Sequence, residues 1–152
     1  MRNHNLLYNL QSGFRRSHST ETALVRLIDQ LLLDMDKDQV SGLVFIDYKK
    51  AIDLIDHDKL LSKLEAYGVA CKELLLFKDY LKGRAQSVVI DGVQSEYRLI
   101  THGVPQGSVL GPLLFITLVN DLPQAVTRSI VDIYADDTTL STSAPVLDLP
   151  GI

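Results

Sequence analysis

Two adjacent aspartates at the tip of a short hairpin constrain this chain more than any other feature. The apolar run Ile130–Tyr134 leads into Asp136 and Asp137, and residues 138–140 follow them. This pattern predicts two strands joined by a tight turn that carries both acids. Adjacent carboxylates repel each other, so solvent, a partner or a cation must offset the repulsion. A divalent metal ion does so, but the pair on its own favours an ordinary solvated hairpin turn.

A third aspartate has the same setting in a distant part of the sequence. Leu43–Ile46 form a continuous apolar run that leads directly into Asp47, which predicts a strand over residues 42–47 that is buried on both faces. Taken alone, Asp47 fits a residue that caps the next turn. If the two strand regions pair side by side, Asp47 meets Asp136 and Asp137. Three such carboxylates can hold two Mg²⁺ ions about 3.5–4 Å apart, the arrangement that stabilises the attacking and leaving oxygens in phosphoryl transfer.

The composition excludes several other classes of protein. With 152 residues, 46% of them hydrophobic, the chain has the length and apolar content of one folded domain. Its single cysteine, Cys71, excludes an internal disulfide and a cysteine-based zinc site. No apolar stretch reaches the length of a membrane span, and no signal peptide is recognisable. We therefore expect an intracellular protein without a membrane partner, and the choice between cytoplasm and nucleus stays open.

The hydrophobic periodicity of the rest of the chain predicts alternating helices and strands. Asp91 and Gly92 separate two strand-like segments and predict a two-residue hairpin turn. Ser19 or Thr20 can cap the first helix, and Asp58 can cap the second. This order fits an α+β fold, in which an antiparallel sheet has helices on one face. The expected helices cover residues 20–36, 58–68, 72–82 and 112–122, the expected strands cover residues 42–47, 85–90, 93–100 and the arms of the last hairpin, and residues 143–152 are expected to be irregular.

Four blocks of sequence occur in a fixed order and together carry a resemblance to a known family. They are residues 11–20, 45–53, 103–112 and 134–137, and residues 120–123 agree with them. The ordered set resembles the palm region of the reverse transcriptases of non-LTR (LINE-like) retrotransposons. The resemblance implies that residues 1–152 form a single partial reverse transcriptase domain, with the motifs in about residues 11–142. It also implies a palm-like antiparallel sheet with incomplete fingers and thumb.

The resemblance further implies a chemistry and the acids that perform it. Asp47, Asp136 and Asp137 would be the catalytic residues and would hold two Mg²⁺ ions, for which Mn²⁺ can substitute. One ion lowers the pKa of the primer 3′-hydroxyl, and the other neutralises charge on the leaving pyrophosphate. The implied function is that of an RNA-directed DNA polymerase, a nucleotidyltransferase. Its partners would be an RNA template, a DNA primer and deoxynucleoside triphosphates.

The same resemblance assigns nucleotide or template contacts to a second set of residues. Gln106, between Pro105 and Gly107, would touch the incoming nucleotide or the template, because glycine lets the backbone approach a ligand closely. Arg84 is a candidate contact to nucleic-acid phosphates, although a solvated surface residue explains it equally well. Ile52 stands where the family usually has Phe or Tyr beneath the nucleotide sugar. We therefore expect weaker exclusion of ribonucleotides.

Three alternatives stay open at this point. A haloacid-dehalogenase-type phosphatase also places an aspartate after an apolar strand, but it needs a second aspartate where this chain has Lys49. A nucleotidyl cyclase with a similar palm shares the metal chemistry but does not need residues 103–112. The third alternative is a truncated, catalytically inactive retroelement fragment that acts at most as a nucleic-acid-binding or interaction module. Exposed core surface and self-association would favour it, and the sequence does not give the oligomeric state.

Overall fold

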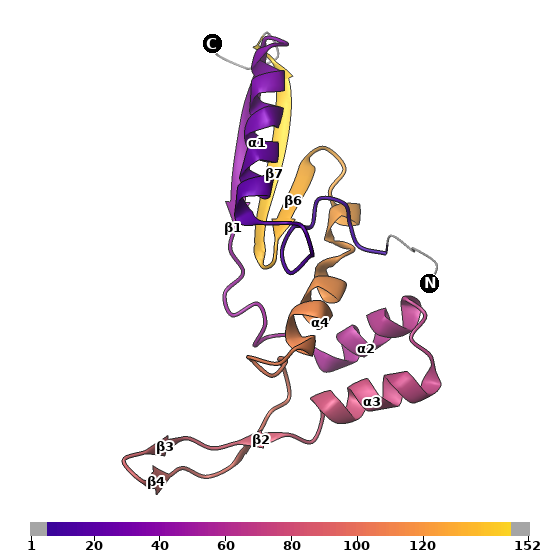
Figure 1. The fold of residues 1–152 in the computed structure, drawn as a ribbon, viewed down its shortest axis with the longest axis vertical. Coiled ribbons are helices and arrows are strands. Elements are labelled where there is room, and N and C mark those ends of the chain that lie inside the picture. The colour runs from indigo at the N-terminus through magenta and orange to yellow at the C-terminus, as the bar shows by residue number, and fades with distance from the viewer. Residues whose placement is uncertain (1–5, 147–152) are drawn as a thin grey trace. The chain divides into compact units, whose positions relative to one another are not determined.

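The computed structural model describes residues 6–146, and the chain divides into two compact units. The first unit combines Met1–Lys49 with Val119–Ile152, and the second is the continuous stretch Lys50–Leu118. Figure 1 shows the helices and strands along the chain. Both units contain helix and antiparallel strand pairs, so the prediction of a mixed helix and antiparallel-sheet fold is confirmed.

A three-stranded antiparallel sheet forms the centre of the first unit, in the order β1-β7-β6. β1 covers Gln39–Ile46, β6 covers Ile130–Tyr134 and β7 covers Asp137–Pro145. β6 and β7 are the arms of the predicted last hairpin, and β7 lies between β1 and β6 (Figure 1). Residues from the two ends of the chain therefore build one sheet.

The strands of this sheet are longer than predicted. β1 begins at Gln39, and β7 continues to Pro145, into the segment that was expected to be irregular. The pairing explains both extensions, because Gln39 lies opposite Pro145 and each strand end supports the other. Residues 147–152, the remainder of the expected irregular tail, lie outside the described residues.

The prediction that β1 is buried on both faces is wrong. β1 is at the edge of the described sheet, and Val44 and Phe45 are 56% and 71% exposed. The continuous apolar run correctly predicted a strand. Apolar character alone does not distinguish a central strand from an edge strand, because that difference depends on which partners the strand finds.

The helix α1, Thr20–Met35, packs on one face of the sheet (Figure 1). Its first turn is closed by a capping box in which Ser19 accepts from the backbone of Thr22 while Thr22 accepts from the backbone of Ser19. On the side that faces the sheet, Arg26 donates two hydrogen bonds to Asp132 of β6, at 2.5 and 2.9 Å. A directional ion pair therefore holds α1 against β6.

A short segment before α1 adds to the edge of β6. Ser12 N–H donates to the carbonyl oxygen of Ile133 at 2.8 Å, and Ile133 N–H donates to that of Leu10 at 3.0 Å. Gln11 forms a parallel bridge with Ile133. This segment shows no hydrophobic periodicity, yet Gln11 and Ser12 are each only 1% exposed.

The second unit contains a pair of helices that pack on each other, α2 (His57–Ala66) and α3 (Cys71–Leu81). α2 begins earlier than predicted, because Asp56 rather than Asp58 caps it. The Asp56 carboxylate accepts from the backbone N–H of Lys59 at 2.9 Å. This hydrogen bond also lowers the pKa of Asp56 below its ordinary value.

The predicted hairpin of the second unit forms as two short ladders rather than two long strands. Asp91 and Gly92 both have positive φ, 50° and 80°, as a two-residue hairpin turn requires. The two ladders leave the intervening residues unassigned to strands, so the alternating pattern overstated the strand length. They pair β3 (Val89–Ile90) with β4 (Val93–Gln94), and β2 (Ala85–Gln86) with β5 (Arg98–Leu99).

The most apolar helix is α4, Leu110–Val119, which buries Leu114, Phe115 and Ile116. It ends before the predicted limit at residue 122, and a short 3₁₀ turn over Leu122–Ala125 follows. Within residues 6–146, no helix combines the length and the apolar character needed to cross a membrane.

Candidate functional site

The pairing of β1 with β7 brings Asp47 to the hairpin acids. Ile46, the last residue of β1, lies opposite Thr138 of β7. Asp47 directly follows the end of β1, and Asp137 is the first residue of β7, directly before Thr138. The two strands are antiparallel, so Asp47 and Asp137 emerge beside each other. The expected pairing of these two distant regions is thus confirmed by the register.

The turn between β6 and β7 carries the remaining acid. Tyr134 and Asp137 are the last paired residues of this hairpin, which leaves Ala135 and Asp136 as the two turn residues. Ala135 is 8% exposed and has a φ of 57°, in the left-handed region that L-residues rarely adopt. The turn is therefore a constrained structure and places Asp136 at the same end of the sheet as the other two acids.

The three acids have the right chemistry for Mg²⁺ but do not form a ready-made cluster. Asp47 and Asp137 are exposed, and Asp136 is half-buried. Within residues 6–146, no group of three or more His, Cys, Asp or Glu side chains is close enough together to hold a metal ion. The fit to a metal ion therefore rests on the shared sheet end and on carboxylate oxygens, which Mg²⁺ prefers. The side chains would have to turn towards one another when an ion binds.

Three of the predicted nucleotide- or template-binding residues line one cavity of the second unit. The cavity measures about 530 Å³, and Arg84, Pro105 and Gln106 are among its lining residues, together with Lys50 and Asp53. Gln106 donates from Nε2 to the Asp53 carboxylate at 2.8 Å. Two cationic side chains and an amide beside a hollow of this size are suited to a phosphate-bearing ligand.

The other two predicted binding residues do not line this cavity. Gly107 lies in the same loop with a φ of 75°, so glycine is favoured there for its conformation. Ile52 is half-buried, and its carbonyl oxygen accepts from the backbone N–H of Val104 at 3.3 Å. Ile52 therefore lies beside the loop without reaching the hollow.

A buried histidine anchors this loop through a hydrogen bond, and the sequence pattern did not predict this contact. His57 is 4% exposed, and its Nε2–H donates to the carbonyl oxygen of Gly103 at 2.7 Å. Gly103 has a φ of 80°, and a Cβ atom there would lie 2.6 Å from the carbonyl oxygen of Asp53. The backbone at Gly103 therefore has room for glycine alone.

Two further residues that the sequence did not single out lie beside the acid-bearing turn. Gln11 accepts a hydrogen bond from the backbone N–H of Ala135, and Gly13 lies directly against the backbone of the same residue. Both belong to the block 11–20, which was recognised only by resemblance. The sequence did contain one signal for this contact, which is Gly13. A glycine often marks a place where two backbones approach each other closely.

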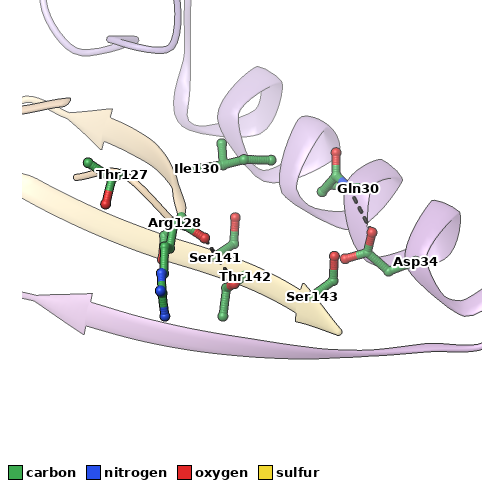
Figure 2. A pocket seen from close by; sticks show the side chains of 9 residues that line it. Gln30, Asp34, Thr127, Arg128, Ile130, Ser141, Thr142 and Ser143 are labelled. Carbon is green, nitrogen blue, oxygen red and sulfur yellow. Dashed lines mark hydrogen bonds between the residues drawn. The ribbon is translucent and has the colours of Figure 1, made fainter. Parts of the chain in front are cut away.

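A second hollow, of about 340 Å³, lies in the first unit towards the other end of β7 (Figure 2). Asp34 of α1 is 4% exposed at its border. Its carboxylate accepts from Ser41 Oγ at 2.6 Å and from Gln30 Nε2 at 2.8 Å. The hydrogen bond from Ser41 is the largest cause of a pKa of Asp34 below its ordinary value. This network joins α1 to β1 at a distance from the acids.

Known proteins resemble this chain over most of its length. Residues 1–146 match the family described as "Reverse transcriptase (RNA-dependent DNA polymerase)". The chain is 36% identical over 141 residues to the RNA-directed DNA polymerase from mobile element jockey of Drosophila funebris, covering 88% of this chain and 15% of that protein.

Two relatives from Drosophila melanogaster match this chain over a similar share of its length. The probable RNA-directed DNA polymerase from transposon BS is 36% identical over 148 residues, which cover 89% of this chain and 16% of the relative. The probable RNA-directed DNA polymerase from transposon X-element is 33% identical over 135 residues, which cover 86% of this chain and 15% of the relative. This chain thus spans only about 15% of the length of the curated relatives it matches.

Proposed function

The chain belongs to the reverse transcriptase family, within the group found in non-LTR retrotransposons, and we propose that its sheet-end acids form the catalytic centre of an RNA-directed DNA polymerase. The observation that carries this proposal is the register of β1 and β7, which puts Asp47 beside Asp137. An ordinary solvated turn needs no third acid from a distant strand. The inactive-fragment alternative is not favoured, because the family match includes every acid of the centre.

Asp47, Asp136 and Asp137 would hold two divalent ions, Mg²⁺ or Mn²⁺. When bound, these ions supply charge neutralisation and activation of the primer 3′-hydroxyl. The protein itself would position the three carboxylates. The strand ladder fixes the backbone of Asp137 and of Ile46, the residue before Asp47, and the constrained turn fixes that of Asp136. With the backbone held in this way, only side-chain rotations would have to be ordered when an ion binds, which lowers the cost of assembling the reacting groups.

The loop cavity of the second unit would bind the nucleotide or the template. Arg84 would pair with phosphate oxygens through its planar guanidinium group, which suits that geometry better than a lysine does. The amide of Gln106 is free to contact the ligand once it leaves Asp53, while Pro105 and Gly107 shape the turn. Ile52 would lie beneath the nucleotide sugar and exclude a 2′-hydroxyl less well than an aromatic ring.

We also propose the larger arrangement that these roles require. Residues 1–152 would form one partial reverse transcriptase domain whose sheet is palm-like, with the motifs in about residues 11–142. The chain spans about 15% of its relatives, so polymerase activity and the binding of RNA template, DNA primer and deoxynucleoside triphosphates are proposed for it by family.

Primer extension on an RNA template in the presence of Mg²⁺ tests the proposed function. Asp136→Asn should reduce extension by about 100-fold or more, because it removes a metal-binding charge from the site. Asp91→Asn is the matched control, since it makes the same chemical change at an exposed hairpin turn. Extension by the wild type and the control, and not by Asp136→Asn, would support the proposal. Extension that survives in Asp136→Asn, or a wild type without any extension, would contradict it.

A further inference from the structure

The turn that carries Asp136 is held in a conformation that its own sequence does not favour. Ala135 has a φ of 57°, where Cβ crowds the backbone of any residue other than glycine. Such a residue keeps this conformation only when its surroundings enforce it. The cause must therefore lie in what packs against Ala135, which is 8% exposed.

The first enforcing contact is a hydrogen bond from the turn to Gln11. The side-chain Oε1 of Gln11 accepts from the backbone N–H of Ala135 at 3.3 Å and from that of Gly13 at 2.8 Å. Gln11 is 1% exposed and lies 124 positions from Ala135 in the sequence. One buried oxygen thus joins the segment beside β6 to the backbone amide of Ala135, the residue before Asp136.

The second enforcing contact is the close approach of Gly13. A Cβ atom at this position would lie 2.1 Å from the backbone nitrogen of Ala135 and 2.6 Å from its Cα. These are backbone atoms, so no side-chain rotation can relieve the overlap. Gly13 therefore allows the two backbones to touch, and the turn cannot move towards this segment.

The burial of the Gln11 amide destabilises the fold. This cost indicates that the two hydrogen bonds accepted by its oxygen are needed for the structure of the turn. Its Nε2 is buried and has no hydrogen-bond partner in the part of the chain that the structure describes. An unpaired buried donor destabilises the fold, and a methionine of similar length would avoid that cost. A side chain kept for packing alone would not need the amide.

We propose that Gln11 and Gly13 are positioning residues that hold the Ala135–Asp136 turn in the geometry needed for metal binding. This inference rests on the proposed function, because it takes Asp136 as a metal ligand. Neither residue touches substrate or metal. Gln11 acts through the Ala135 amide, and Gly13 acts by limiting where the Ala135 backbone can lie. Partners of this kind, one step removed from the ligands, commonly change metal affinity about 10- to 100-fold when they are lost.

Amide hydrogen exchange tests the contact itself, without any metal. In Gln11→Met, the Ala135 amide should exchange about fivefold faster or more, because its acceptor is gone. Gln11→Glu keeps an acceptor oxygen at the same reach and should restore protection of that amide. Ser12→Ala is the matched control: Ser12 is equally buried, but its hydroxyl contacts Arg26 rather than the turn.

Binding of Mn²⁺, followed by electron paramagnetic resonance, tests the consequence. Gln11→Met should weaken Mn²⁺ binding about tenfold or more, and Ser12→Ala should leave it within about twofold. If Gln11→Met does not fold cooperatively, Gln11→Asn serves in its place, because its shorter side chain withdraws the oxygen from Ala135. A purely structural role for Gln11 would lower the unfolding temperature without changing the affinity of the folded protein.

The outcomes separate this inference from the proposed function. Unchanged Ala135 exchange, or unchanged Mn²⁺ affinity, in a folded Gln11 variant would overturn the positioning role. The metal site would survive that result if Asp136→Asn still loses Mn²⁺. Equal Mn²⁺ affinity in wild type and Asp136→Asn would instead overturn the metal site, and the positioning role with it.

Discussion

In the first unit, Asp47 and Asp137 lie directly beyond the end of a continuous ladder of paired backbone residues between β1 and β7, which finishes at Ile46 and Thr138. In the second unit, the loop that carries Gln106 is fastened by a few individual contacts, chiefly the hydrogen bond from His57 to Gly103. Backbone pairing thus places Asp47 and Asp137, whereas particular side chains place the loop. We expect the positions of Asp47 and Asp137 to tolerate most side-chain substitutions in the strands and to be lost when backbone pairing is broken. In the second unit, we expect a single substitution to displace the loop.

The largest effect should come from breaking the ladder in β7, the middle strand of the sheet. Leu140 of β7 pairs with Val44 on one side and Val131 on the other. Leu140→Pro removes a backbone donor from a strand with neighbours on both sides, and should cost roughly 3 kcal/mol or more of unfolding free energy. Amide exchange across β1 and β6 measures this loss.

The conservative change at the same position is the control. Leu140→Val keeps the backbone donor and most of the apolar volume, so it should cost about 1 kcal/mol. Similar losses for the proline and the valine variants would show that side-chain packing, rather than backbone pairing, places the acids.

A smaller effect is expected where the second unit depends on one glycine. Gly103→Ala introduces a Cβ atom 2.6 Å from the carbonyl oxygen of Asp53, at a φ of 80°. We expect a loss of about 2–4 kcal/mol in urea-induced unfolding, from conformation and overlap together. Gly92→Ala is the matched control, because Gly92 has the same φ of 80° and nothing within 4 Å of its Cβ position.

The difference between these two alanine variants isolates the close approach. Gly92→Ala should cost only about 1 kcal/mol, the conformational part alone. Equal losses of unfolding free energy in the two variants would mean that the backbone at Gly103 can shift at little cost to accommodate a Cβ atom. Mn²⁺ affinity should be unchanged in both variants if the acids are placed independently.

A further experiment asks whether Ile52 belongs to the nucleotide site. Ile52 belongs to the second unit and stands five positions after Asp47, which belongs to the first. Ile52→Phe should increase the preference for deoxynucleotides over ribonucleotides by about tenfold, because a flat ring would exclude the 2′-hydroxyl. Single-nucleotide incorporation measures this ratio. The same ratio for both proteins would remove Ile52 from the nucleotide site.

The smallest effect concerns the side-chain network of the first unit, and it depends on pH. The folded-state pKa of Asp34 is below its ordinary value of 3.8, mainly because Ser41 donates to the carboxylate. Its contribution to stability is therefore complete above the ordinary pKa and is lost as the pH falls through the lower folded-state pKa. Wild type should be more stable than Asp34→Asn near neutral pH, and the difference in unfolding free energy should shrink in acid. A difference that is constant from pH 7 to strong acid would contradict this.

The acid positions could be predicted because each depends on a local pattern. An apolar run ending in aspartate marks Asp47, and two acids at a hairpin tip mark Asp136 and Asp137. The same patterns could not show that β1 is an edge strand, since that depends on distant partners. The cap at Asp56 was missed because the sequence offers Asp58 as an equally good choice. Gln11 was missed because its role is to meet Ala135, a residue that no local pattern links to it.

The division of the sheet between the two ends of the chain has a consequence for folding during synthesis. The second unit is one continuous stretch, Lys50–Leu118, so all of its internal contacts can form as soon as it has left the ribosome. β1 is made earlier but has to wait for β7, because its described pairing partner begins only at Asp137. Long-range pairing of this kind is slow. Asp47, Asp136 and Asp137 therefore come together last, and until then β1 presents unpaired backbone and the apolar side chain of Phe45 to its surroundings.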